Sequence, residues 1–478
     1  FQCQEKHFIR LHGCDLPLYP LEIKGSESLS NIYTYEIKCF SKSDNKSLTK
    51  LHGTSLSCEI GEKYKSLPSR FIHGVVTKII YNYDNSMQNS CIIVLQPEIS
   101  ELASGKRTRI WTNTTASEIV STILKNSLFN TPQIRLYEKE SLIEYKIQYK
   151  ESDLDFIHRL LSDAGIYYFF IHDKNKHIMI LADAPASHPK AVHDKMEYLP
   201  SKNLKESHHG YMTEWSAIEN LKCPSVTLSG YNDSNINEIT ITSESIVMDV
   251  AVGKGIYEDI IPEGKREFIQ KRSEAVMASC DSEIKRWYGK TNSWWLSCGE
   301  CFSLDKQEYR ITSLHINAVN NYLDNTAYCN CDLSASDNDS AIKFKSKYNI
   351  PVIPGVLLAK VIGPESEEYY TDEYGRVKIR FLWGEKSSCW VRVSQVWSGD
   401  GFGSQFIPRI GSEVLVSFIQ GNPDYPIIVG TVYNGQNKPP FSLPENNCKS
   451  GFITRSVKNG NKGEGHHLIL DDKINEEK

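Results

Sequence analysis

Residues 372–434 read DEYGRVKIRFLWGEKSSCWVRVSQVWSGDGFGSQFIPRIGSEVLVSFIQGNPDYPIIVGTVYN. This stretch contains strand-like runs at 376–383, 389–397, 412–419 and 426–433, and a fifth run lies just upstream at 355–362. Glycine-rich turns separate the runs, and none of the runs has helical periodicity. Five short strands with tight corners are typical of a small closed barrel of the OB type. The connecting loops hold no usual set of catalytic residues, so we expect a rigid module rather than an enzyme.

The same stretch and the residues after it carry six short motifs. They are DEYGRVK at 372–378, CWVRV at 389–393, GSQFIPRIG at 403–411, GNPD at 421–424, GTVYN at 430–434 and KPPF at 438–441. Together these motifs resemble the VgrG family, the spike proteins of bacterial type VI secretion systems. Further matches at 71–74 and 145–161 extend the resemblance over nearly the whole chain. The resemblance implies structural or interface roles for Tyr374, Gly375, Arg376, Trp390, Arg392, Gly403, Gln405, Phe406, Pro408, Arg409 and Gly411.

The length and charge of the chain argue against several classes of protein. With 478 residues it is too long for one core, and about three domains are expected. A formal net charge of −5 and a pI near 6.3 make nucleic acid a poor default partner. The longest apolar run, 166–171, is far shorter than the ~20 residues of a membrane-spanning helix. Charged residues and proline interrupt every apolar stretch near the start, so no signal peptide is visible.

Alternating and helical patterns divide the chain into five regions. Alternation broken by turn clusters predicts an antiparallel β barrel or sandwich at 1–99 and a second β module at 184–348, the latter with a helix near 264–279. The resemblance implies that both modules are hub-like β barrels. An α/β insertion is predicted at 100–183, because Thr115 and Glu118 form a capping-box pair and Ser152 with Asp155 opens a second helix. The OB-type barrel follows at 349–434 and a polar tail at 435–478. The predicted fold class is therefore mainly β with an α+β insertion.

The tail from residue 435 contains only isolated apolar residues in a segment rich in Gly, Asn and Lys. So few apolar groups cannot offset an ordering cost of about 1–2 kcal/mol per residue within one chain. The tail is therefore either disordered or shares a core with other copies of itself. The resemblance favours the second state, because the VgrG tail opens a three-chain intertwined β needle.

The thirteen cysteines are odd in number and scattered through strand-like contexts, which is typical of buried free thiols rather than of a disulfide framework. Cys298 with Cys301 and Cys329 with Cys331 form two close pairs that leave a structural zinc ion as an alternative. The second pair is one residue too tight for the usual zinc knuckle, so we favour buried strand cysteines. No cofactor is predicted.

Two other readings of the OB-type segment compete with a structural role. The glycine-rich loop at 399–404 resembles a phosphate loop, but a strand rather than a helix follows it, which disfavours nucleotide binding. Trp383, Trp390 and Trp397 lie near a modest cationic stripe formed by Lys378, Arg380 and Arg392. The alternative function is therefore an OB-fold protein that binds nucleic acid or polysaccharide.

The leading hypothesis is a non-enzymatic spike and hub component of a type VI secretion system. The resemblance implies a homotrimer that caps the tail tube, punctures the target-cell membrane and carries effector proteins. It also implies Hcp-type hexameric tail-tube rings, baseplate components and a PAAR-type tip protein as partners. Assembly in the bacterial cytoplasm, followed by export through the apparatus, is the expected route.

Overall fold

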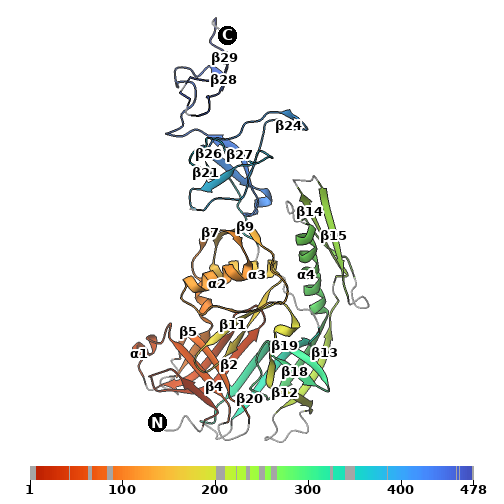
Figure 1. Cartoon of the computed structure of the whole chain (residues 1–478). Coiled ribbons are helices and arrows are strands. Elements are labelled where there is room, and N and C mark those ends of the chain that lie inside the picture. The colour runs from red at the N-terminus through yellow and green to blue at the C-terminus, as the bar shows by residue number, and fades with distance from the viewer. Residues whose placement is uncertain are drawn as a thin grey trace. The chain divides into compact units, whose positions relative to one another are not determined.

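The computed structural model in Figure 1 describes most of the chain. The described residues are 7–41, 43–62, 67–82, 90–200, 210–221, 223–232, 237–246, 253–259, 266–322, 327–339, 350–384, 386–458, 460–461 and 463–475. The chain divides into two compact units. Unit 1 comprises Phe1–Gly105, Thr115–Leu142 and Ser152–Asn349, and unit 2 comprises Lys106–Thr114, Ile143–Glu151 and Ile350–Lys478. None of the helices within the described ranges is long and apolar enough to cross a membrane.

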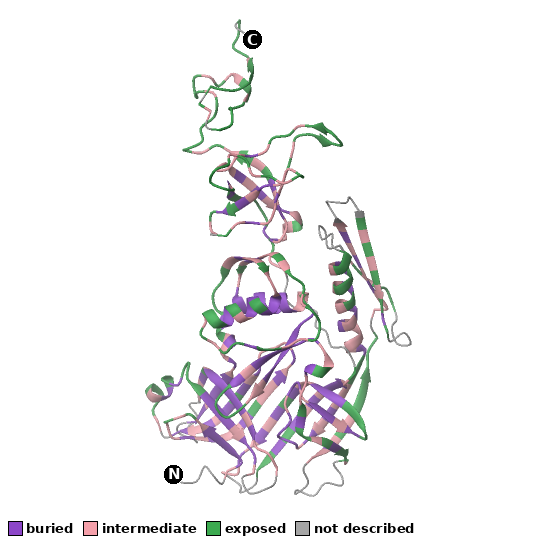
Figure 2. Cartoon of the chain, viewed as in Figure 1, coloured by how far each residue is buried: buried purple, intermediate pink, exposed green. Residues whose placement is uncertain are grey.

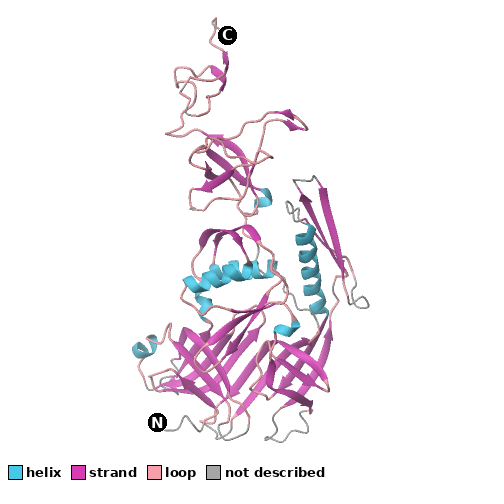
Figure 3. Ribbon diagram, in the orientation of Figure 1, coloured by secondary structure: helices cyan, strands magenta, loops and turns pink. Residues whose placement is uncertain are grey.

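A large β-sheet forms the body of unit 1, as the magenta strands in Figure 3 show. Among the described residues it has twelve strands in the order β1-β4-β5-β6-β3-β2-β19-β18-β12-β13-β17-β20. In chain order these are β1 (Ile9–His12), β2 (Leu18–Ser28), β3 (Thr34–Ser41), β4 (Ser55–Ile60), β5 (Arg70–Asn82), β6 (Ser90–Gln96), β12 (Lys190–Tyr198), β13 (Tyr211–Glu219), β17 (Lys285–Thr291), β18 (Cys301–Leu304), β19 (Gln307–Val319) and β20 (Tyr328–Asp337).

The sheet makes two curved modules, in agreement with the predicted mainly β fold class. The strands from β19 to β20 form a closed ring, because β19 and β20 also pair with each other. The six N-terminal strands form the other module. The two modules are not separate, because β2 pairs with β19 from Glu22↔Val319 to Ser28↔Ser313. This continuity was not predicted, since alternation along a strand does not reveal a pairing partner almost 300 residues away.

The helices predicted in the insertion are present, and they lie against the sheet of unit 1 (Figure 3). Helix α2 (Ala116–Asn126) begins with the predicted capping box, in which the Thr115 amide donates to Glu118 Oε2 at 3.0 Å. Helix α3 (Asp153–Asp163) begins at Ser152, whose Oγ accepts from the Asp155 amide at 3.0 Å. A hairpin follows α3 and consists of β10 (Tyr167–His172) and β11 (His177–Ala182). A short strand, β8 (Gln133–Arg135), pairs with β11.

A smaller α/β layer interrupts the second module of unit 1. Its strands are β14 (Ser225–Asn232), β15 (Asn237–Glu244) and β16 (Ile256–Asp259), with β14 in the centre. Helix α4 (Arg266–Ile284) packs against this sheet through a core that includes Val226, Leu228, Ile269 and Met277. The predicted start of this helix at 264 lies outside the described residues. Short helical turns elsewhere are α1 (Asn45–Thr49), η2 (Glu98–Ala103), η3 (Pro185–Ser187) and η5 (Ile419–Gly421).

Unit 2 contains the predicted five-stranded barrel. Its strands are β21 (Leu357–Ile362), β22 (Lys378–Phe381), β23 (Arg392–Val393), β26 (Glu413–Phe418) and β27 (Pro426–Val432), in the order β22-β21-β26-β27-β23. A bridge between Val377 and Val391 joins the two ends of this order and closes the barrel. The run predicted at 389–397 leaves the barrel after β23, because the chain continues into a separate hairpin of β24 (Ser398–Gly399) and β25 (Phe402–Gly403). Two tail strands, β28 (Lys449–Ile453) and β29 (His467–Asp471), form another hairpin.

Two strands of the predicted 100–183 insertion belong to unit 2. β7 (Arg107–Thr114) and β9 (Ile143–Glu151) pair with each other, and their buried residues Ile110 and Ile147 pack into the core of the barrel. Asp424 fixes this ribbon, because its Oδ1 accepts from the Ile147 amide at 2.8 Å and its Oδ2 lies 2.9 Å from Lys146 Nζ. The structure thus splits the insertion between the two units. The other predicted boundaries stay predictions, and the one at 348/349 lies outside the described residues.

We predict that Asp424→Ala lowers the free energy of unfolding of unit 2 by about 1–3 kcal/mol, because it removes an acceptor of the buried Ile147 amide and the partner of Lys146. Asp424→Asn keeps an acceptor for the amide and should have a smaller effect. Urea denaturation followed by tryptophan fluorescence measures both, with the exposed Asp472→Ala as control. Equal stabilities for Asp424→Ala and the control would contradict this role.

Candidate functional site

The first group of predicted motif residues forms a tight turn before β22. Asp372 Oδ1 accepts from the amides of Tyr374 and Arg376 at 3.1 and 2.9 Å. Its other oxygen lies 2.6 Å from Arg376 Nε, and the guanidinium lies over the ring of the exposed Tyr374. Gly375 has a φ of 71°, a left-handed conformation that favours glycine. These residues therefore shape a turn and leave one aromatic ring exposed.

Trp390 and Arg392 lie at the edge of the barrel and are both half-buried. The Trp390 ring is 5.0 Å from the ring of Tyr370, and Lys378 Nζ lies 5.1 Å from its centre. Arg392 begins β23, which pairs with β27. Lys378, one member of the cationic stripe, is thus in contact with an aromatic ring of its own module.

Gly403, Gln405 and Phe406 belong to the hairpin that leaves the barrel. Gly403 has a φ of 131°, and a Cβ atom there would lie 2.5 Å from the Trp397 carbonyl oxygen, so only glycine fits. Gln405 and Phe406 are exposed, and the Phe406 ring stacks on that of Phe452 in β28 at 5.4 Å.

Pro408, Arg409 and Gly411 lead from that hairpin back into β26. Pro408 is buried, and the Gly411 amide donates to the Val361 carbonyl at 2.9 Å. Arg409 donates from Nε to the Tyr369 hydroxyl at 2.8 Å and also contacts Glu368 and the Arg455 carbonyl. The eleven predicted residues thus occupy one module as turn, edge and contact residues, without converging on a common pocket. Their predicted interface role stays a prediction.

The two close cysteine pairs do not come together as a set of zinc ligands. Cys298 Sγ lies 3.3 Å from the Thr312 carbonyl oxygen, whereas Cys301 Sγ lies 3.3 Å from Asn338 Oδ1. Cys329 and Cys331 both lie on β20, and their sulfur atoms are 3.8 Å apart. Among the described residues, no group of three or more His, Cys, Asp or Glu side chains could hold a metal ion. The zinc alternative therefore has no ligand set in this part of the chain.

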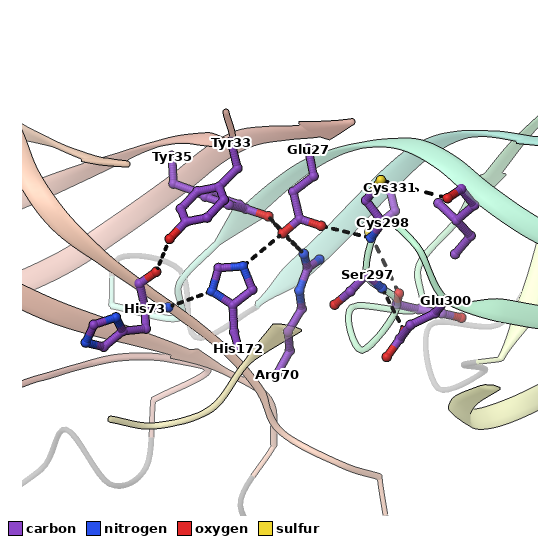
Figure 4. Close-up of polar contacts among 12 residues, drawn as sticks. Glu27, Tyr33, Tyr35, Arg70, His73, His172, Ser297, Cys298, Glu300 and Cys331 are labelled. Atoms are coloured by element: carbon purple, nitrogen blue, oxygen red, sulfur yellow. Dashed lines mark hydrogen bonds and ion pairs between the residues drawn. The ribbon is translucent and has the colours of Figure 1, made fainter. Parts of the chain in front are cut away.

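A group of buried polar residues lies in unit 1, around Glu27 of β2 (Figure 4). Glu27 Oε1 lies 2.7 Å from Arg70 Nη2 of β5 and accepts from the Tyr35 hydroxyl of β3 at 2.5 Å. Its Oε2 accepts from the Cys298 amide at 2.9 Å, in the loop before β18. One buried carboxylate thus links strands of the first module to a loop of the second.

A set of histidines extends this junction into the insertion, as Figure 4 shows for His172 and His73. His172 Nδ1 accepts from the His73 amide at 3.2 Å, so the neutral ring carries its proton on Nε2, which lies 3.8 Å from Glu27. His73 Nδ1 and His177 Nδ1 are 2.9 Å apart. The junction therefore contains three imidazoles from β5, β10 and β11 around one ion pair.

Burial and charge together set the pKa values of this junction. Burial opposes ionisation of Glu27, but the charge of Arg70 and the hydrogen bonds outweigh it and lower the pKa of Glu27. Burial lowers the pKa of His172 to about 4 and that of His177 to about 3. At neutral pH the junction therefore holds one ionised pair among neutral imidazoles. It is a structural device, because its groups have little access to solvent.

Comparison with known proteins agrees with this architecture. Residues 26–322 match the family model of the phage tail baseplate hub (GPD), and residues 366–433 match the type VI secretion system/phage-baseplate injector OB domain. The type VI secretion system spike protein VgrG1a of Pseudomonas aeruginosa is 30% identical, over 97% of this chain and 76% of that protein. The chain belongs to the VgrG family. VgrG1b of the same organism is also 30% identical, over 94% of this chain and 63% of that protein.

Another VgrG protein and two solved structures are also similar to this chain. The actin cross-linking toxin VgrG1 of Vibrio cholerae is 28% identical, over 95% of this chain and 43% of that protein. The E. coli c3393 protein, a type VI secretion component, matches with a TM-score of 0.60 and 19% identity, over 89% of this chain and 99% of that one. A chain of the half-lidded Francisella PdpA–VgrG complex matches with a TM-score of 0.60 and 10% identity, over 95% of this chain and 79% of that one. The structural matches support the hub-like fold.

The Glu27 junction was not predicted from the VgrG sequence, although one signal was available. Arg70 begins a strand-like run in which Ile72, Gly74 and Val76 share its face, and all of these residues are buried. A charged residue at an inward position of an apolar strand indicates a buried partner. Its partner Glu27 could not be identified, because the two residues lie on strands that the sequence does not pair.

We predict that Glu27→Gln and Arg70→Met each lower the free energy of unfolding by about 3–5 kcal/mol, because each leaves a buried group without its partner. The double variant should lose less than the sum of the two. Chemical denaturation of the four proteins measures this coupling. Lys190→Met is the control, since its ion pair with Glu308 is exposed and screened by solvent, so its loss should change the free energy of unfolding little. Strictly additive losses would argue against the coupling.

We also predict that this chain loses stability as the pH falls from about 6.5 to about 4. Burial lowers the pKa of His158 and His172 to about 4 and that of His177 and His188 to about 3, so the unfolded chain binds more protons in this range. Glu300 and Glu98 act in the opposite direction, because burial raises the pKa of Glu300 to about 7 and also raises that of Glu98, so two carboxyl groups oppose the four histidines. The free energy of unfolding, measured by chemical denaturation at several pH values in this range, should fall less steeply with pH for His172→Gln than for wild type. The exposed His52→Gln should keep the wild-type slope. A flat wild-type profile would refute the prediction.

Proposed function

We propose that this VgrG chain is a non-enzymatic, homotrimeric hub and spike component of a type VI secretion system. The observation that carries the trimer is the tail hairpin of β28 and β29 in unit 2. Figure 2 shows this hairpin largely in the colour of exposed residues. Strand β29 contains three consecutive exposed apolar residues: Leu468 is 62% exposed, Ile469 39% and Leu470 55%.

The hairpin is apolar on both faces. Phe452 pairs with Leu468, so both lie on the same face as Leu470, and Phe452 is also exposed. Ile469 lies on the opposite face, since successive side chains of a strand alternate. An isolated two-stranded hairpin is at best marginally stable in water, and this one presents apolar groups on both sides. One neighbouring copy covers one face, so covering both faces takes two neighbours.

Three copies of the chain meet this requirement, because each hairpin then lies between two others. Closed cyclic symmetry is the usual arrangement of homo-oligomers. An intertwined tail of this kind also gives a stiff, continuous β structure, which suits a spike that bears axial load. Membership of the VgrG family supports the same state.

The remaining partners follow from the family and form part of the proposal. We expect Hcp-type tail-tube rings, baseplate components, a PAAR-type tip, effector proteins and, by puncture, the target-cell membrane. Carriage of effectors is supported by two relatives, one named an actin cross-linking toxin and one present in a complex with PdpA. Assembly in the bacterial cytoplasm and export through the type VI apparatus complete the proposal. Binding of nucleic acid or polysaccharide stays the alternative, and Lys378, one of the three residues of the cationic stripe, lies over the Trp390 ring of its own module.

We predict a particle of three times the 54.4-kDa chain mass in native mass spectrometry and sedimentation. Leu470→Lys and Ile469→Lys change opposite faces of the tail hairpin. Each should raise the concentration at which half of the trimer dissociates, on the order of tenfold or more. The control is Val192→Lys in β12, where a 70% exposed apolar residue lies far along the chain in unit 1.

If only one of the two tail substitutions weakened the assembly, only one face of the hairpin would be buried by a neighbouring copy. This result would contradict the three-copy arrangement. A wild-type chain that stays monomeric at micromolar concentration would refute the trimer. Turnover on any substrate would refute the non-enzymatic role.

A further inference from the structure

The hairpin of β24 and β25 forms a projecting arm in unit 2, defined here as residues 395–406 (Figure 1). Gln395 Oε1 accepts from the Phe406 amide at 2.9 Å at its base. Further along, the Ser404 amide donates to the Trp397 carbonyl at 2.8 Å. The tip pairs Gly399 with Phe402. The backbone of the arm is therefore hydrogen-bonded along its length, so the arm is preformed rather than a loose loop.

The side chains of the arm are apolar and uncovered. Val396 is 95% exposed, Trp397 63% and Phe402 59%. The rings of Trp397 and Phe402 pack edge to face at 5.5 Å, which makes one aromatic knob. Asp400 is the single charged residue of the arm sequence. A rigid aromatic knob in water is typical of an interface anchor, because its burial gains apolar contact at little cost in conformational entropy.

The same module carries a second exposed apolar surface, the outer strip, defined as Leu358, Leu415 and Val429. Leu358 on β21 pairs with Leu415 on β26, and both alternate with core residues, so they point away from the barrel interior. Val429 lies at the bulge opposite Leu415 on β27. Leu358 and Val429 remain 40% and 46% exposed, so the arm of the same chain does not cover the strip.

We infer that the arm of one copy packs on the outer strip of the next copy. The chain supplies both halves of an apolar contact and leaves both uncovered, which points to a second copy rather than to a different partner. Such a contact joins two different surfaces, and three of them close into a ring around a three-fold axis. The Phe406 ring at the base of the arm stacks on Phe452 of the tail hairpin, so the contact is continuous with the tail surface proposed to be shared. This inference rests on the proposed trimer and names the contact that closes it.

The test places the photo-crosslinking residue p-benzoylphenylalanine at position 397 in the full chain. Equal amounts of light chain and of ¹⁵N-labelled chain are mixed, dissociated, reassembled and irradiated, and crosslinked peptides are identified by mass spectrometry. We expect mixed-isotope crosslinks from position 397 to peptides that contain Leu358 or Val429. The control places the same residue at Val192, where no such crosslinks are expected.

A second measurement uses Trp397→Ser with Phe402→Ser, which should raise the concentration for half-dissociation of the trimer on the order of tenfold or more. The control pair is Val192→Ser with Tyr257→Ser, which removes apolar side chains of similar exposure from unit 1. Circular dichroism checks that both variants fold. A trimer that forms without these crosslinks, or with crosslinks only inside one chain or elsewhere, overturns the inference and leaves the proposed trimer intact. A wild-type chain that is monomeric overturns both.

Discussion

The ladder between β2 and β19 holds the two modules of unit 1 in one sheet, and the buried carboxylate of Glu27 sits within it. Glu27 pairs with Leu314 across this ladder, while its side chain binds Arg70, Tyr35 and the Cys298 amide. A slip of one residue would turn every side chain of β2 to the other face and would leave Arg70 buried without its partner. The ion pair therefore specifies the register of a contact that joins residues almost 300 positions apart, which apolar packing alone specifies less strictly.

Local patterns predicted the local structure of this VgrG chain well. The capping pairs at Thr115 and Ser152 predicted the starts of α2 and α3, and the five runs around residues 355–433 predicted the barrel of unit 2. These signals are local, because a cap or an alternation needs only a few neighbouring residues.

Long-range pairings could not be predicted in the same way. The continuity of β2 with β19 and the transfer of β7 and β9 to unit 2 both depend on partners far away in sequence. Asp424 belongs to the GNPD motif at 421–424, and that motif gave no sign that its side chain holds the β7–β9 ribbon through Ile147 and Lys146. The motif residues were recognised by resemblance, and the structure places them as turn, edge and contact residues of one module.

The chain crosses between the two units at 105/106, 114/115, 142/143, 151/152 and 349/350. Most domain pairs in a single chain are joined by one linker, and tension on one part then reaches the other through a single covalent thread. Here five backbone segments connect the two units, and four of them continue directly into the paired strands β7 and β9. Because Ile110 of β7 and Ile147 of β9 pack into the barrel core, these four connections lead into the folded core of unit 2 rather than into a free linker.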